Sequence, residues 1–386
     1  MMKRIFQKSV ILFVIYFISQ VNSFSQEKPD YRNLVNIIPT AVPFLSISPD
    51  SRSGGMGGVG VAISPDFNSQ FWNPAKYAFI DKDFGIGLGF TPWLRHLIGD
   101  INLFSLSGFY RIDDMQGLSA SLRYFSIGAI TIRESGDANA PVYDVSPNEF
   151  AIDLAYNRVL SDYFSGSVAF RYIRSDLNSG INTLNAEAGN SFAADVAFYY
   201  HTPIKLGGYD SQLSAGVNVS NIGSKMSYDG GTTREFIPTN LGLGVAVETE
   251  MDAYNTITFS LDANKLLVPT PGLTEEDNYD EYRQRYNDTG TLKGMFQSFS
   301  DAPRGFKEEM EEINLCFGAE YWYDKQFAVR AGYYHEHKNK GNRKHFTAGI
   351  GLKFNILTLD ASYIIAVNQN NPLANTIRFS LGVDIK

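Results

Sequence analysis

From about Asp83 onward, apolar residues alternate with small or polar residues along most of the chain. The segments 346–354 and 377–385 show this clearly, with Phe, Ala, Ile, Leu or Val at every second position and Thr, Gly, Ser or a charged residue between them. Segments of about ten residues with a period of two have the length and pattern of transmembrane β-strands. A soluble β-sandwich shows the same alternation, so the period alone does not decide between the two.

We expect about fourteen strands, an even number as single-chain outer-membrane barrels require. The alternation places them at 84–94, 103–112, 117–127, 148–159, 163–174, 191–201, 212–222, 238–248, 255–265, 313–323, 326–335, 345–354, 357–366 and 376–385.

The links between these segments alternate in length, and this distinguishes a barrel from a sandwich. Tight turns such as 160–162 and 324–325 alternate with longer loops such as 128–147 and 266–312. Short turns on one rim and long loops on the other are typical of outer-membrane barrels. The sequence therefore predicts an all-β fold, a transmembrane up-and-down antiparallel β-barrel over 83–386, with long extracellular loops of which 266–312 is the largest.

The region before the barrel has a different character. Residues 1–25 have the basic start, the short apolar run and the small residues of a signal peptide. Residues 26–82 lack a sustained period and are expected to form an N-terminal plug, or hatch, inside the barrel, organised around the glycine-dense stretch 51–75. Its glycines permit positive φ angles and close backbone approach. With both ends of the barrel on the short-turn side, the plug is expected to start in the periplasm.

The glycines Gly55, Gly57 and Gly60 formally match a dinucleotide-binding fingerprint. That fingerprint requires a strand before it and a helix after it. Prolines precede the glycines here, and the segment 59–63 that follows has no helical period. The glycines are therefore interpreted as part of the plug.

The composition of the chain limits the classes of partner and structure that are compatible with it. The formal charge of −8 becomes −11 once Lys3, Arg4 and Lys8 leave with the signal peptide, which argues against nucleic acid as a partner. Aromatic residues make up 14% of the chain, as aromatic girdles at both membrane interfaces would produce. Cys316 is the only cysteine, so no intrachain disulfide forms.

We find no arrangement of residues that points to catalysis, a cofactor or a metal, so a non-enzyme is expected. His335, His337 and His345 fall near one hairpin, but a metal site needs further converging ligands, so solvated histidines are the preferred interpretation. The acidic run of Glu308, Glu309, Glu311 and Glu312 has no basic partner nearby in sequence, and a solvated rim is expected.

Several charged residues lie on the predicted strands, where lipid exposure would be costly. They are therefore expected to point into the lumen and to pair there, with Arg52 and Asp66 of the plug joining them. These strand residues are Arg123, Arg171, Arg330, Lys353, Arg378, Asp153, Asp195, Asp262, Glu320 and Asp384.

The loop 266–312 is longer than a plain connection requires, and such loops are usually functional or disordered. A docking surface for another protein and a solvated acidic loop both remain open, and a short helix could begin at Asp280. The candidate partner-binding residues in this loop are Tyr279, Tyr282, Arg283, Phe296, Phe299 and Phe306.

The plug carries the motif on which a family resemblance rests. Its glycine-rich string, followed by Asn-Pro-Ala and a barrel, resembles the FadL-like outer-membrane superfamily. The longer runs 43–57 and 69–77 resemble the PorV family, outer-membrane components of the type IX secretion system of Bacteroidota. The positions that match the hatch motif are Arg52, Gly54, Gly55, Met56, Gly57, Asn73, Pro74 and Ala75.

This resemblance implies a non-enzymatic role in the outer membrane of a Gram-negative bacterium. The implied partners are a large translocon barrel (SprA/Sov-like), the C-terminal signal domains of secreted cargo, a sortase-like attachment complex (PorU-like) and outer-membrane lipid. The alternative is a FadL-like channel for uptake of hydrophobic small molecules. The predicted inward faces are rich in Gly, Ser, Thr and charge rather than apolar, which favours a sealed scaffold.

Overall fold

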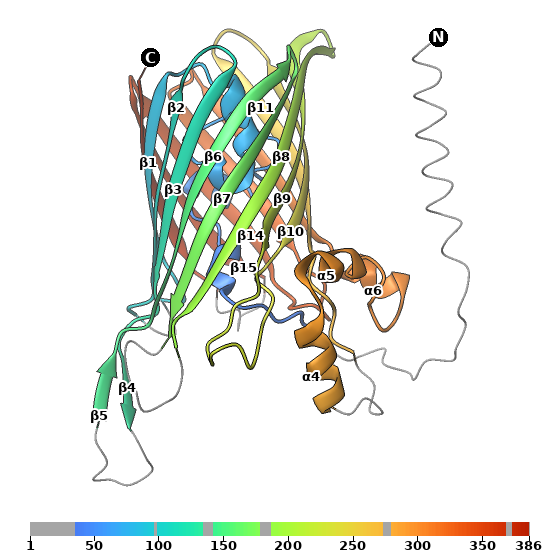
Figure 1. The fold of residues 1–386 in the computed structure, drawn as a ribbon. Coiled ribbons are helices and arrows are strands. Elements are labelled where there is room, and N and C mark those ends of the chain that lie inside the picture. The colour runs from blue at the N-terminus through green and yellow to red at the C-terminus, as the bar shows by residue number, and fades with distance from the viewer. Residues whose placement is uncertain are drawn as a thin grey trace, which may run out of the picture. The chain divides into compact units, whose positions relative to one another are not determined.

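The computed structural model describes residues 35–95, 99–133, 142–177, 187–272, 279–367 and 373–385, and the predicted signal peptide lies outside these ranges. Within them, fourteen antiparallel strands close into one barrel, in which β1 pairs with β16 (Figure 1). The predicted fold class and the expected strand number are confirmed. The barrel strands are β1 (Phe84–Pro92), β2 (Asn102–Arg111), β3 (Gln116–Ser126), β6 (Asn148–Ser161), β7 (Phe164–Asp176), β8 (Gly189–Leu206), β9 (Tyr209–Gly223), β10 (Asn240–Glu250), β11 (Asn255–Leu266), β12 (Asn314–Tyr323), β13 (Phe327–His335), β14 (Lys344–Phe354), β15 (Leu357–Ala366) and β16 (Ile377–Ile385).

The two rims differ as the link lengths predicted. Tight turns lie at one rim, and the long loops extend from the other, at the bottom of Figure 1. The loop between β3 and β6 contains a separate hairpin of β4 (Ile130–Arg133) and β5 (Val142–Val145), which the sequence analysis did not predict. The loop between β11 and β12 contains α4 (Tyr279–Asp288), α5 (Thr291–Gln297) and α6 (Phe306–Glu311), and α4 covers the position where a short helix was expected.

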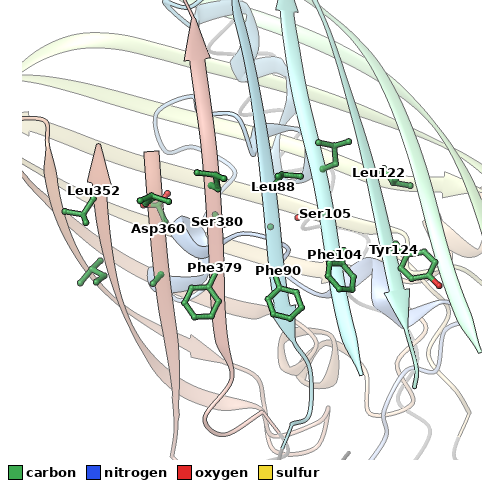
Figure 2. A pocket seen from close by; sticks show the side chains of 16 residues that line it. Leu88, Phe90, Phe104, Ser105, Leu122, Tyr124, Leu352, Asp360, Phe379 and Ser380 are labelled. Atoms are coloured by element: carbon green, nitrogen blue, oxygen red, sulfur yellow. The ribbon is translucent and has the colours of Figure 1, made fainter. Parts of the chain in front are cut away.

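The outer face of the barrel is apolar and carries a row of aromatic rings. Figure 2 shows Phe379, Phe90, Phe104 and Tyr124 at one level on β16, β1, β2 and β3. The strand register joins them directly, because Phe90 pairs with both Phe379 and Phe104, and Phe104 pairs with Tyr124. These rings line a groove of about 550 Å³ on the outer face. Such a row is the aromatic girdle that membrane barrels place at an interface.

The described helices give no membrane-spanning candidate, since none is both long and apolar enough to cross a bilayer. The plug lies inside the barrel and contains a short 3₁₀ helix (Pro43–Ser46), α2 (Ser51–Gly55), α3 (Ser69–Trp72) and a second 3₁₀ helix (Pro74–Phe79). Buried apolar clusters join it to the wall at both ends. One contains Phe44, Leu103 and Phe125, and another contains Phe67 and Phe109.

The expectation that the plug starts in the periplasm is wrong. Its first described residues lie at the long-loop rim, where the amide of Asn36 donates to the carbonyl of Asn339 (2.8 Å) and the amide of Ala41 donates to that of Phe236 (2.9 Å). Both acceptors belong to long loops. The chain therefore runs through the lumen from the long-loop rim before β1 begins at the short-turn rim. Strand parity fixes where β1 starts, but it does not fix where the plug enters.

The close contact between plug and wall generates a first prediction. A Cβ atom added at Gly332 of β13 would lie 2.1 Å from the backbone nitrogen of Gly57 in the plug. Because neither backbone can yield easily, Gly332→Ala is expected to destabilise the protein by about 1–3 kcal/mol, as overpacking typically does. Thermal unfolding in detergent, followed by the gel shift of unheated and heated samples, measures this change.

The matched control is Gly99→Ala, because an added Cβ at Gly99 meets nothing within 4 Å. Equal melting temperatures for Gly332→Ala and the control would show that the plug retreats from the wall without cost.

Candidate functional site

The plug is fixed to the wall by a chain of buried charges. Arg52 of α2 donates from Nε and Nη2 to the two carboxylate oxygens of Glu320 on β12 (3.0 and 2.7 Å) and from Nη1 to Asp66 (2.9 Å). Glu320 also accepts from Arg330 of β13 (2.6 Å), which donates in turn to Asp360 of β15 (2.6 Å). Signs alternate along this chain, so each buried charge has an opposite neighbour. The expected pairing of Arg52 with lumenal charges is therefore observed.

The motif glycines lie where the plug backbone touches the wall. Gly55 packs against Gly349 of β14, where an added Cβ would lie 3.1 Å from the Gly349 Cα. Gly57 has a φ of 75°, a conformation that favours glycine, and its amide donates to Thr347 Oγ1 (2.8 Å). The same hydroxyl donates to the carbonyl of Gly55 (2.8 Å). The backbone of the glycine string is therefore held directly against β14.

Two other motif positions complete this contact. Gly54 faces Arg378, and the side chain of Met56 is fully buried in a cluster with Val59, Ile63 and Cys316.

The Asn-Pro-Ala motif, residues 73–75, caps a helix in the second half of the plug and connects that half to the first half and to the wall. Asn73 Oδ1 accepts from the amide of Ala75 (3.1 Å) and caps the 3₁₀ helix that Pro74 begins. Asn73 Nδ2 donates to the carbonyls of Val61 (3.0 Å) and Phe198 (3.0 Å), and so joins the glycine-rich half of the plug to β8. The two motif segments, separate in sequence, therefore meet in the lumen.

The sequence analysis did not identify Lys76 as part of this arrangement, and it did not predict the role of Asp262. Lys76 is fully buried and donates from Nζ to the carbonyl of Gly60 (2.7 Å). Asp262 of β11, noted only as a lumenal charge, accepts from the amides of Gly60 (2.7 Å) and Val61 (2.9 Å). The position of Lys76, directly after Ala75 in the plug, was the available signal for the first of these.

A second cluster of buried charges lies within the barrel wall and connects its strands to one another. Arg171 of β7 pairs with Asp153 of β6 and with Asp195 of β8 (2.9 Å), and it also donates to Asn221 of β9. All of these side chains are buried, as predicted for charges on the inward faces. The cluster links four neighbouring strands.

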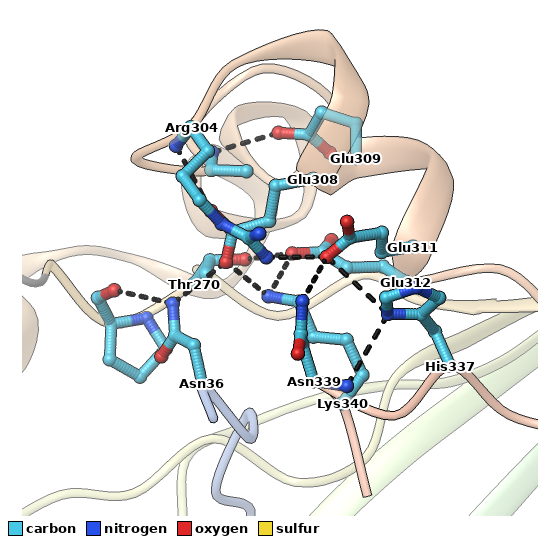
Figure 3. A network of polar contacts seen from close by, with 12 residues as sticks. Asn36, Thr270, Arg304, Glu308, Glu309, Glu311, Glu312, His337, Asn339 and Lys340 are labelled. Carbon is cyan, nitrogen blue, oxygen red and sulfur yellow. Dashed lines mark hydrogen bonds and ion pairs between the residues drawn. The ribbon is translucent and has the colours of Figure 1, made fainter. Parts of the chain in front are cut away.

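The outer rim contains a network that corrects a prediction. Glu308, Glu309, Glu311 and Glu312 were expected to be solvated, but all four are buried (Figure 3). Their basic partners come from distant parts of the chain, which is why the sequence concealed them. Lys265 Nζ donates to Glu309 (2.9 Å) and Glu312 (2.5 Å), Lys340 Nζ donates to Glu308 (2.7 Å) and Glu312 (2.9 Å), and Arg304 pairs with Glu308 (3.3 Å) and Glu311.

This rim network also holds the start of the plug. Asn36 Nδ2 donates to Glu308 (3.0 Å) and to the carbonyl of Pro271 (3.2 Å). Burial alone would raise the pKa of the Glu308 carboxyl, but hydrogen bonds from Lys340 and the Arg304 backbone outweigh burial and hold that pKa below its usual value. Three chain segments are therefore joined at one ionised carboxylate.

The candidate partner-binding residues divide into two groups. Phe296, Phe299 and Phe306 expose 69%, 45% and 69% of their surface on or beside α5 and α6. Arg283 pairs with Glu235 of the neighbouring loop (2.9 Å). Tyr279 and Tyr282 fall in α4, and their side chains lie outside the described part of the structure.

The histidines do not gather into a metal site in the described residues. The expectation of a solvated histidine is wrong for His345, which is buried and stacks on Tyr334, with ring centroids 5.0 Å apart. His337 lies near Glu311 of the rim network instead (3.4 Å).

The charge chain generates a second prediction, and Cys316 provides its readout. Cys316 is 1% exposed, lies on β12, and is covered by the plug residues Met56 and Val59. Arg52→Ala removes one partner of buried ion pairs, which typically costs about 3–5 kcal/mol. The plug should then open more often, and the rate of Cys316 labelling by N-ethylmaleimide in purified protein should rise at least tenfold. Lys205→Ala, which breaks an exposed ion pair, is the control. An unchanged labelling rate in Arg52→Ala would show that the charge chain does not hold the plug.

Asp301 at the rim generates a third prediction. Burial, with the charges of Glu309 and Glu312, raises the pKa of Asp301 to about 7, although the amide of Thr270 donates to it. An acid whose folded pKa is raised destabilises the fold increasingly as pH rises from its unfolded pKa to its folded pKa. Asp301→Asn should therefore slow proteolysis of the 267–313 loop at pH 8, and the difference should shrink toward pH 4. Asp288→Asn, on an exposed residue, is the control. Protection that is equal at both pH values would contradict this account.

Comparisons with known proteins extend these observations. The structure resembles the toluene transporter TodX of Pseudomonas putida (12% identity, TM-score 0.48, covering 86% of this chain and 97% of that one). It also resembles the toluene transporter TbuX of Ralstonia pickettii (9%, 0.42, 92% and 99%) and a FadL homologue of Pseudomonas aeruginosa (12%, 0.42, 91% and 99%). No curated protein matches the sequence.

The family model described as "Type IX secretion system protein PorV" matches residues 30–273. With the closed barrel and its apolar outer face, this match identifies an integral β-barrel of the outer membrane. Because the matched residues make up more than half of the chain, the chain belongs to the PorV family of type IX secretion system proteins.

Proposed function

We propose that this protein binds the large translocon barrel of the type IX system and the C-terminal signal domains of secreted proteins. It then passes this cargo to the sortase-like attachment complex on the cell surface. Membership of the PorV family supports a role in type IX secretion. The role is non-enzymatic in this proposal, since transport through the system needs recognition and transfer rather than bond cleavage by this chain.

The observation that carries the proposal is that the plug is fixed inside the barrel, whereas the long loop beyond the outer rim exposes apolar side chains. The buried ion pair between Arg52 and Glu320 holds the plug against the barrel wall, so the plug obstructs the lumen. Beyond the rim, Leu292, Phe296 and Phe306 each expose at least 60% of their surface. These side chains lie on α5 and α6 of one loop, and exposed apolar side chains outside the membrane are typical of protein–protein interaction sites. A rigid barrel that presents such a loop outward suits docking better than conduction.

The rim network gives this docking loop a fixed position. Lys265 belongs to β11, and its two ion pairs hold α6 at the end of the barrel wall. Loops that carry function are commonly held by a rigid scaffold in this way. We infer that α5 and α6 form a preorganised surface, which lowers the ordering cost of binding.

We also propose that the regions divide as the sequence suggested. Residues 1–25 act as a signal peptide, 26–82 as the plug, and 83–386 as the barrel. In this division the hatch motif from Arg52 to Ala75 serves to seal the lumen.

The alternative is a channel for uptake of hydrophobic small molecules. A lumenal cavity of about 360 Å³ between plug and wall supports it. The cavity is lined by four arginines as well as by apolar side chains, which suits a purely hydrophobic solute poorly.

A fourth prediction tests the docking surface. Affinity purification of the tagged protein from native outer membranes, followed by mass spectrometry, should recover a very large barrel protein and secreted proteins that share a C-terminal domain. The triple variant Phe296→Ser, Phe299→Ser and Phe306→Ser should reduce that recovery at least fivefold, because it removes the exposed apolar contact.

The control is Met115→Ser, an exposed apolar residue in a tight turn at the opposite rim. Undiminished recovery with the triple variant would place the contact elsewhere. A wild-type barrel that carries only fatty acid or another lipid would overturn the secretion role in favour of uptake.

A further inference from the structure

The lumenal cavity has a pronounced positive character. It lies between the plug residues 43–58 and the long-loop ends of the strands, with a volume of about 360 Å³. Arg123, Arg171, Arg343, Arg378 and His345 line it, and the described residues that line it include no aspartate or glutamate. A cavity lined by one sign of charge attracts counter-ions, because its low-dielectric walls concentrate the field.

Three of these arginines already have acceptors. Arg171 pairs with two aspartates, Arg343 pairs with Glu336 (2.6 Å), and Arg123 donates from Nη1 to the carbonyl of Leu45 (3.2 Å). Their charge is therefore at least partly compensated by the protein.

Arg378 on β16 differs from them. It is 5% exposed, it makes no hydrogen bond or ion pair with any described residue, and its buried Nε has no partner. The carboxylate of Asp50 lies within electrostatic range, but its oxygens accept from Trp72 Nε1 (2.7 Å) and the amide of Ser53 (2.8 Å). A buried guanidinium without an acceptor is costly unless something else supplies one.

Other free polar atoms surround this guanidinium. Ser362 is the cross-strand partner of Arg378, and its Oγ has no hydrogen-bond partner. The Nδ1 atom of His345 also lacks one, and the charges of Arg343 and Arg378 both act on that ring. Gly54 leaves the space open, because a Cβ there would lie 3.0 Å from Arg378 Cδ and 3.2 Å from Ser362 Oγ. Several unsatisfied groups therefore meet beside one cavity.

We propose that this cavity binds an anionic ligand through Arg378, with a carboxylate or phosphate group as the recognised chemistry. The planar guanidinium fork matches both groups, and charge-assisted hydrogen bonds of this type are short and strong. Phe44, Ile47 and Ile364 form apolar parts of the same cavity and accommodate a small apolar remainder of the ligand. The site lies in the lumen, and it does not depend on the partner contacts proposed for the rim.

The test uses the purified full-length protein and its own fluorescence. Two of the three tryptophans, Trp72 and Trp93, line the cavity. Titration with inorganic phosphate, and separately with hexanoate, at constant ionic strength should give a saturable fluorescence change with at least one of them. Arg378→Gln should raise the dissociation constant at least tenfold, whereas Arg378→Lys, which keeps the charge but loses the fork, should raise it less.

Controls separate this site from general charge effects. Arg158→Gln, at an exposed arginine on β6, should leave binding unchanged, and hexanol should not reproduce the effect of hexanoate. Tighter binding of phosphate would identify a phosphate ligand, and tighter binding of hexanoate would identify a carboxylate with an apolar tail. The proposal is overturned if neither anion gives a saturable fluorescence change. It is also overturned if the dissociation constant is unchanged in Arg378→Gln, provided that the gel shift on heating shows this variant to be folded.

Discussion

The structure depends on the ion pair between Arg52 in the plug and Glu320 in the barrel wall. A closed sheet of this size has an inward face that must be filled or left wet, and this sequence fills it with a segment that carries its own charge. Because both partners are buried, separating them removes one opposite charge from each in a low-dielectric surrounding, and among their described ion-pair partners only Asp66 and Arg330 then remain to balance them. The plug is therefore positioned by a contact that tolerates little displacement.

That contact sets the requirements for the residues around it. Holding Arg52 at Glu320 brings the backbone of α2 onto β14. A Cβ atom at Gly55 would lie only 3.1 Å from the Cα atom of Gly349 there, so glycine at both positions favours the close approach. Asn73 and Lys76 then tie the later part of the plug to the carbonyls of Val61 and Gly60. The hatch motif therefore combines one ion pair, between Arg52 and Glu320, with the glycines and the Asn73 cap that allow the plug backbone to lie close to the wall.

The sequence predicted the strands well and the long-range pairings poorly, for a physical reason. A period of two is a local property, so the strand positions could be read directly from the alternation. The burial of Glu308 and Glu312 depends on Lys340, which approaches only when two long loops meet at the rim. The entry of the plug from the long-loop side depends likewise on a distant hydrogen bond, from Asn36 to Asn339. The inward charges were predictable because the lipid face excludes them, whereas their individual partners were not.

The two halves of the lumen differ in how closely the plug packs against the wall. Toward the short turns, Phe67, Tyr77 and Phe109 pack closely and leave little room. Toward the long loops, the cavity beside Arg378 remains between the plug and the wall. On the long-loop side, the lumen therefore keeps a positively charged recess between the plug and the wall. The same chain segment that seals the barrel also forms the inner wall of that recess, so sealing and recognition of an anion are compatible in one fixed conformation.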